Sequence, residues 1–209
     1  MDKTARLRTV GAIGSVAVIA FGLFVAKPGS TYRFAPLFLV PIVWLPYLFR
    51  RWLRLHPLHY VLFILAILLH NLGAMGWYQK SPLPMSFDIA VHFYFGVVGG
   101  FLVYRMLQQS LPLRGWTLGL MTVLIVLGAG AIHEEVEWFS TLLLGPEKGM
   151  LKTPAQGVYI FDTQRDMFNN WVGSILAVTI YALVQRRRRA VPDVVAATAD
   201  ARREAVGAV

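Results

Sequence analysis

Residues 116–144 read WTLGLMTVLIVLGAGAIHEEVEWFSTLLL, and this stretch decides the fold class. As an α-helix, these 29 residues would extend for about 43 Å, which is more than the ~30 Å hydrocarbon core of a bilayer. The apolar residues form a block, whereas a soluble helix or strand would interleave them with polar residues at its own period. The stretch therefore predicts a membrane-spanning helix.

Five further apolar blocks accompany this one. The predicted spans are residues 9–26, 34–49, 58–77, 87–107, 116–144 and 163–185. Each is long enough, or nearly so, to cross the hydrocarbon, and prolines punctuate the breaks between them. We therefore predict an all-α, polytopic membrane bundle with six transmembrane helices in residues 1–189. Residues 190–209 are predicted to form a cytoplasmic tail, either disordered or loosely helical.

The composition excludes most soluble classes. Of the 209 residues, 56% are hydrophobic and only 15% are charged, whereas soluble domains carry about 25% charged residues. The formal net charge of +9 would suggest nucleic-acid binding in a soluble protein. Here most basic residues lie between the apolar blocks, on one side of the predicted membrane, so we expect no nucleic-acid partner. The positive-inside rule assigns that side to the cytoplasm and places both termini there.

Ionisable residues inside the predicted spans mark a candidate site, because each costs about 2.5–3.5 kcal/mol to insert. Asp88 and His92 lie one helical turn apart, as do His133 and Glu137. Given the predicted orientation, four spans bring such groups to the outer half of the bilayer. The predicted cluster contains His70, Asp88, His92, His133, Glu134, Glu137, Asp162, Arg165, Asp166 and Asn170.

The acidic excess of this cluster predicts a bound cation or shared protons. Mixed carboxylate and imidazole ligands suit a divalent metal ion such as Zn, Mn or Fe. The predicted metal ligands are Asp88, His92, Glu134, Glu137 and Asp166. The candidate catalytic groups are Glu134, Glu137 and Asp162, and the supporting residues are His70, His133, Arg165 and Asn170. A carboxylate pair that shares a proton would satisfy the same electrostatics without a metal.

Three motifs resemble one bacterial family. They are FDIAVHFYFG at 87–96, EEVEW at 134–138, and QG at 156–157 followed by DTQRDM at 162–167. In this order they are similar to the motifs of YjdF-type inner-membrane proteins. Phe161 and His133 depart from the residues more usual in that family, but the carboxylates do not. The resemblance implies a multi-pass protein of the bacterial inner membrane without an established activity.

A more distant similarity is to VanZ-like proteins, which are associated with glycopeptide tolerance at the cell envelope. They share an Asp and His-Phe opening, a carboxylate in the next helix and an Asp-x-x-x-Asn-x-x-Gly ending. That ending is Asp166, Asn170 and Gly173 in this chain. The resemblance adds no reaction to the interpretation.

Three classes of function fit these residues. A metal-dependent enzyme acting on a membrane lipid or a lipid-linked envelope component predicts a bound metal and an opening toward lipid. Near that opening, Gly96, Gly99 and Gly100 either let helices approach closely or leave room for an acyl chain. A cation- or proton-linked transporter or sensor predicts a polar path to the cytoplasmic side. A structural membrane protein predicts paired carboxylates without a cavity. Residues 145–161 form either a lid over the cluster or a solvated loop, and the sequence does not indicate the oligomeric state.

Overall fold

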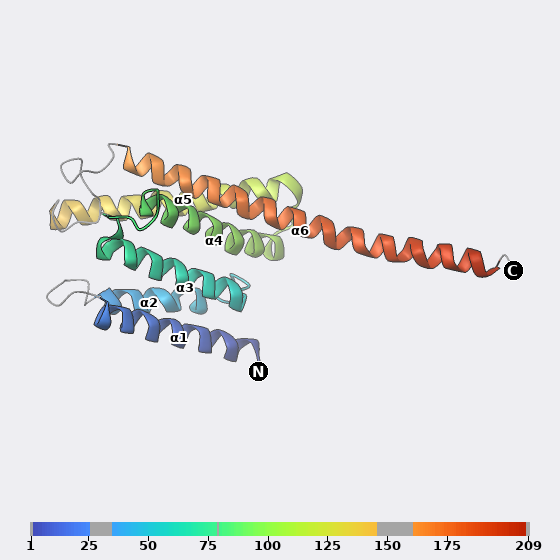
Figure 1. The fold of residues 1–209 in the computed structure, drawn as a ribbon, viewed down its shortest axis with the longest axis horizontal. Helices are drawn as coiled ribbons and strands as arrows, with labels where there is room; N and C mark the ends of the chain where they lie inside the picture. The colour runs from blue at the N-terminus through green and yellow to red at the C-terminus, as the bar shows by residue number, and fades with distance from the viewer. Residues whose placement is uncertain (1, 26–34, 79, 146–160, 208–209) are drawn as a thin grey trace.

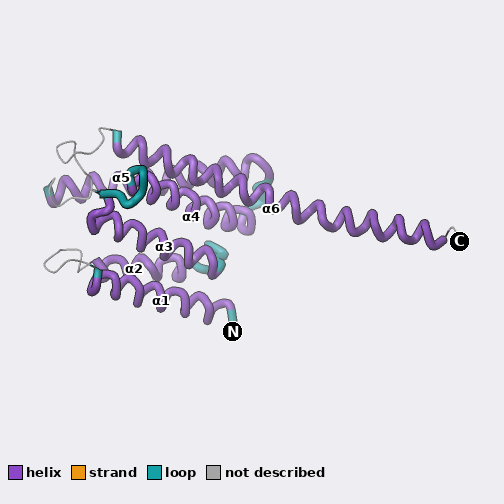
Figure 2. The backbone as a smooth tube through the Cα atoms, viewed as in Figure 1, coloured by secondary structure: helices purple, strands orange, loops and turns teal. Residues whose placement is uncertain are grey.

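The computed structural model describes residues 2–25, 35–78, 80–145 and 161–207. Over these residues the chain forms six α-helices and one π-helical turn, with no strand. The helices lie roughly side by side along the long axis of the molecule (Figures 1 and 2). The all-α prediction is thus confirmed for the described residues. The predicted lid falls outside them, apart from its first and last residues.

The helix bounds follow the apolar blocks of the sequence. The elements are α1 (Lys3–Phe24), α2 (Ala35–Leu48), α3 (Pro57–Leu72), η2 (Gly73–Trp77), α4 (Phe87–Ser110), α5 (Gly115–Leu144) and α6 (Asp162–Gly207). Within the described ranges, α1, α4, α5 and the segment Asp162–Arg186 of α6 are long and apolar enough to cross a membrane. Helices α2 and α3 are apolar but shorter, and the 16 residues of α3 extend for about 24 Å.

The third predicted span differs from a single α-helix at its C-terminal end. Helix α3 ends at Leu72 and continues as the π-helical turn η2, in which Gly76 has a φ of 128°. A side chain on Gly73 would overlap the ring of Tyr78, so glycine allows that ring to fold back onto the helix. The Tyr78 hydroxyl then lies 2.8 Å from Nδ1 of His70 in a hydrogen bond. The irregular turn therefore orients one of the predicted site residues.

Helices α1, α2 and α3 form a hydrophobic core of their own. Two hydrogen bonds fix their packing. The indole Nε1 of Trp44 donates to Oγ of Ser15 at 2.9 Å, and the buried Tyr60 hydroxyl donates to the Val43 carbonyl at 2.8 Å. The second bond joins α3 to the backbone of α2 and therefore holds the two helices in register.

The most extensive helix contact in the described chain joins α4 and α6. At this contact, Gly96 of α4 and Gly173 of α6 each face the backbone of the opposite helix, so no side chain separates the two backbones there. A Cβ on Gly96 would lie 2.9 Å from Cα of Asn170, and a Cβ on Gly173 would lie 2.9 Å from the backbone nitrogen of Val97. Small residues permit such close approach of membrane helices. The contact fixes α6 against the first half of α4, where Asp88 lies.

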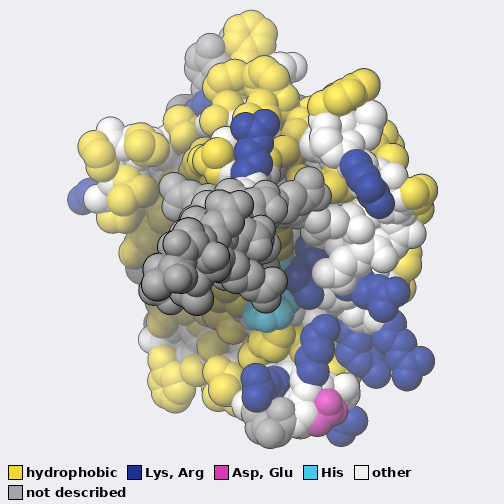
Figure 3. All heavy atoms as spheres, turned by 90° about the vertical axis from the view of Figure 1, so that its right-hand side faces the viewer, with side chains coloured by type: hydrophobic (Ala, Val, Ile, Leu, Met, Phe, Trp, Pro, Cys, Tyr) yellow, Lys and Arg dark blue, Asp and Glu magenta, His cyan; other side chains and the backbone are white. Residues whose placement is uncertain are grey.

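The N-terminus and the C-terminal part of α6 leave the bundle at the same end (Figure 1). Lys and Arg side chains gather on this face, which shows little acidic surface (Figure 3). Helix α6 continues to Gly207. The described residues of the predicted tail are therefore helical in the structure. An alanine-rich composition favours this continuation. The division into a membrane unit and a tail stays a prediction.

His56 begins α3 at the same end of the bundle. Its Nδ1 accepts a hydrogen bond from the backbone N–H of Leu58 at 3.2 Å and so acts as the N-cap of the helix. Partial burial, followed by the positive charges of Arg105 and Lys3, lowers the pKa of His56 from its ordinary value of 6.5. The surroundings therefore favour the neutral imidazole that the cap requires.

Candidate functional site

The predicted site residues converge at the end of the bundle opposite the N-terminus. Helices α4 and α6 both begin at that end (Figure 1), which places Asp88 and Asp162 in their first turns. Helix α5 brings His133 and Glu134, and α3 brings His70. Residues more than 90 positions apart in the sequence therefore share one level of the bundle, as the alternating helix directions predicted.

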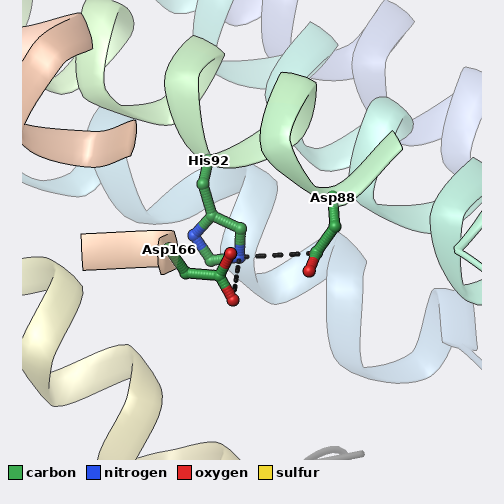
Figure 4. Close-up of side chains that lie close together, drawn as sticks. All are labelled: Asp88, His92 and Asp166. Atoms are coloured by element: carbon green, nitrogen blue, oxygen red, sulfur yellow. Dashed lines mark ion pairs between the residues drawn. The ribbon is translucent and has the colours of Figure 1, made fainter. Parts of the chain in front are cut away.

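The centre of the site is a buried group of one histidine and two aspartates. Nε2 of His92 lies 3.6 Å from Oδ1 of Asp88 and 3.6 Å from Oδ2 of Asp166 (Figure 4). The three side chains are only 7%, 13% and 5% exposed, in the order His92, Asp88, Asp166. Each offers one ligand atom, and these atoms lie within 4.8 Å of one another. We call this group the Asp-His-Asp triad.

The spacing of the triad suits a metal ion. Metal bonds of 2.0–2.2 Å in tetrahedral geometry place two ligand atoms about 3.3–3.6 Å apart, close to the separations found here. Two nearby carboxylate oxygens, Oδ1 of Asp166 and Oε1 of Glu134, are buried without a hydrogen-bond partner among the described residues. Such atoms are normally satisfied by protein, water or an ion. The triad could therefore hold a metal ion.

Arg165 neutralises part of the acidic charge. Its Nη2 donates to Oδ2 of Asp88 at 2.9 Å and also to Oδ1 of Asp162, while Nε lies 3.7 Å from Oδ1 of Asp166. One guanidinium thus faces three carboxyl groups, next to the imidazole of His92. A divalent cation or protons would supply the remaining positive charge.

Glu134 and Glu137 lie outside the triad, although the sequence predicted both as metal ligands. Oε1 of Glu137 lies 3.3 Å from Nε2 of His133, one turn earlier on α5. Glu134 is buried and hydrogen-bonds the side chain of Thr163 on α6. Each carboxylate thus faces a different neighbour, so the expected repulsion within the pair is partly relieved. Their roles as ligands or catalytic groups stay predictions.

Three imidazole rings form a row that begins at His92 of the triad. The His133 ring centroid lies 6.0 Å from that of His70 and 6.0 Å from that of His92. Nδ2 of Asn170 lies 3.4 Å from Nδ1 of His92, so the amide of α6 orients the triad imidazole. The row connects α3, α4 and α5, so His70 and His133 lie close to the triad, and their supporting roles stay predictions.

A cavity of about 270 Å³ begins at the histidine row. His70, His92, His133 and Asn170 line one end, and apolar residues of α3, α4 and α5 line the rest. The apolar walls include Phe63, Val98, Leu102 and Val126. The site therefore combines a polar, acidic end, which contains the triad, with a hydrophobic cavity.

Sequence reasoning missed three contributors to this site. Tyr78 bonds His70, Thr163 bonds Glu134, and the Phe95 ring stacks on His133 with centroids 6.5 Å apart. Because Thr163 directly follows Asp162, the sequence could have predicted that it lies near the cluster. The position of Tyr78 depends on the irregular turn after α3, which no pattern in the sequence indicated.

The comparisons with known proteins identify a family. No curated protein and no solved structure matches the chain. A family model described as predicted membrane protein, DUF2238, matches residues 9–187, which include α2 to α5, most of α1, the first half of α6 and every residue of the site. The YjdF-type resemblance is consistent with this match, and the VanZ-like similarity stays a prediction. The chain therefore belongs to the DUF2238 family of predicted membrane proteins.

Proposed function

We propose that this protein is a metal-dependent enzyme that acts on a membrane lipid or a lipid-linked envelope component. In this proposal the ion is Zn, Mn or Fe, held by Asp88, His92 and Asp166. The substrate enters from the outer leaflet of the bacterial inner membrane, in which the protein is a multi-pass component. The observation that carries the proposal is the buried Asp-His-Asp triad, whose three ligand atoms lie within 4.8 Å of one another.

The chemistry follows from the groups around the triad. A bound divalent ion polarises an ester or phosphoryl oxygen and lowers the pKa of a coordinated water. Three protein ligands leave a coordination position for water or substrate, as catalytic zinc sites do. Glu134, with one buried carboxylate oxygen lacking a hydrogen-bond partner in the described chain, is the candidate general base.

Six spans with both termini in the cytoplasm complete the proposal. The two termini leave the bundle at one end, which fits an even number of crossings, and basic side chains gather on that face (Figures 1 and 3). The short helices α2 and α3 count as spans because local thinning and tilting accommodate modest mismatch. The triad then lies toward the periplasmic surface.

The two alternative functions receive less support. Transport predicts a polar path continuing toward the cytoplasm, but beyond the histidine row the cavity walls are apolar. A structural role predicts carboxylates paired with Arg165 and no cavity. The pairing with Arg165 is present, but so is a cavity next to it.

Metal analysis of the purified protein in lipid nanodiscs tests the proposal. Wild type should retain about one equivalent of a divalent metal after extensive dialysis, because three buried ligands bind it. Asp166→Asn, which keeps the shape of the side chain, should lose most of it. Glu135→Gln is the matched control, since Glu135 is exposed on α5 beside the site. Wild type without metal, or equal metal in the Asp166→Asn variant, would overturn the proposal.

A second arm tests catalysis. Protein in vesicles of bacterial phospholipids is followed by mass spectrometry for released fatty acids and head groups, with and without a chelator. Product that depends on both metal and Asp166 supports an enzyme. The same assay on lipid extracts of the bacterial envelope includes the lipid-linked components. If both lipid sources stay unchanged while metal is bound, the catalytic part of the proposal is wrong.

A further inference from the structure

We infer that the cavity beside the histidine row binds one hydrocarbon chain of a membrane amphiphile, with the polar end of that molecule at His92 and His133. This inference rests on the proposed function and deepens it, because it names the class of molecule that the site takes. The inference places the hydrocarbon chain in a part of the protein that is distinct from the triad.

The lining of the cavity matches such a molecule. At one end, three imidazoles and the Asn170 amide supply hydrogen-bonding groups, and one of these imidazoles, His92, belongs to the triad. Away from this end the lining is apolar, with Phe63, Val98, Leu102 and Val126 among the wall residues. A ligand that is polar throughout would leave its own groups without partners there. An amphiphile with one chain satisfies both halves.

The length of the cavity also fits a long chain. Its lining on α4 runs from Val91 to Val103, and these thirteen residues span about 18 Å along the helix. That distance is more than half of the ~30 Å hydrocarbon core. The cavity is therefore long enough to hold a hydrocarbon chain that extends from the outer part of the bilayer toward its middle.

The surrounding helices leave a lateral route into the cavity. Helices α3 and α5 each pack on α4 without packing extensively on one another in the described chain. The rings of His70 and His133 bring them together at the polar end. Below that level, Phe63, Phe95 and Leu102 are partly exposed. Because the surroundings at this depth are lipid tails, the most abundant candidate occupant is a lipid chain.

The substitution Gly99→Leu would fill part of the cavity without changing a residue of the triad. A Cβ at this position would lie 3.4 Å from Cγ2 of Val126, an ordinary contact, so a leucine would project its remaining atoms into the cavity. Ala129→Leu would fill the same space from α5. Gly128→Leu is the matched control, because Gly128 is exposed and a Cβ there meets no atom within 4 Å.

Photo-crosslinking tests the inference. Wild type is placed in vesicles of phosphatidylethanolamine and phosphatidylglycerol that contain a trace of phosphatidylglycerol with a photoactivatable group on its acyl chain. Peptide mass spectrometry should locate the label on the cavity walls of α4 and α5. Labelling there should fall about tenfold in Gly99→Leu and in Ala129→Leu, because the added atoms take the space of the chain, and stay unchanged in Gly128→Leu.

The metal content separates this inference from the proposed function. Both cavity-filling variants should retain metal, which also shows that they fold, and Asp166→Asn should lose metal while keeping the label. Label spread evenly over the lipid-facing surface of wild type, or undiminished in a filling variant that retains metal, would overturn the inference and leave the proposed function standing. Wild type that carries the label but no metal would overturn the proposed function instead.

Discussion

Replacing Gly96 by alanine should separate α4 from α6 and so disrupt the triad from a distance. The added methyl group would overlap the backbone of Asn170, whose carbonyl and Cα both lie against Gly96. Backbone atoms cannot rotate away as a flexible side chain can. The helices themselves must therefore move apart, and Asp166 lies on the moving helix, one turn before Asn170.

The structure sets the size of the effect. The Cβ of the new alanine would lie 2.9 Å from Cα of Asn170, whereas carbon atoms in contact prefer about 3.5–4.0 Å. The helices must therefore separate by at least about 0.6 Å, which would lengthen the 3.6 Å separation between His92 and Asp166. Overpacking of this kind costs about 1–3 kcal/mol, partly offset by the ~1 kcal/mol gained by alanine in a helix.

Two measurements in nanodiscs assess this prediction: the free energy of unfolding and the affinity for the metal. Gly96→Ala should lose up to about 2 kcal/mol of stability, and its metal affinity should fall. Gly128→Ala carries the same change at an exposed position with open space around it, so it should gain up to about 1 kcal/mol of stability and keep its metal affinity. If the two variants behave alike, the close backbone contact of α4 and α6 does not hold the triad.

Three further predictions follow from individual contacts. Arg165→Gln should lower the free energy of unfolding by about 3 kcal/mol, because it leaves buried carboxyl groups unpaired, and Arg165→Lys should restore part of the loss in the same unfolding assay. Tyr60→Phe should cost about 0.5–1.5 kcal/mol by removing the hydrogen bond to the Val43 carbonyl, and unchanged unfolding would refute that bond. The pKa of His56 is lowered, so its contribution to stability is complete above its ordinary value of 6.5 and is lost as the pH falls through the lowered value. Unfolding measured from about pH 7 to about pH 5 should show this loss in wild type and not in His56→Asn, whose amide oxygen can cap the helix at every pH.

The helices could be predicted because hydropathy and length alone specify them. The block at 116–144 corresponds to α5, which runs from Gly115 to Leu144. The end of α3 could not be predicted in the same way. Its irregular turn depends on the Tyr78 ring packing where Gly73 has no side chain, a tertiary contact that periodicity does not contain.

The membership of the cluster could be predicted, but its pairings could not. The spacing of Asp88 and His92 places both on one face of α4, and alternating helix directions bring α6 to the same level. Which groups pair depends on the rotation of each helix about its own axis. The rotations of α4 and α6 bring Asp166 to His92. Glu137 instead pairs with His133 one turn away on its own helix, as the spacing predicts. The cavity likewise arises from the spacing of three helices, which no single segment specifies.

X-ray absorption at the edge of the bound metal tests the central claim most directly, in wild type and in His92→Gln. The account predicts one imidazole nitrogen and carboxylate oxygens at about 2.0–2.2 Å in wild type, with the imidazole signal absent from the variant. A metal that shows no imidazole ligand, or a spectrum that His92→Gln leaves unchanged, would contradict it.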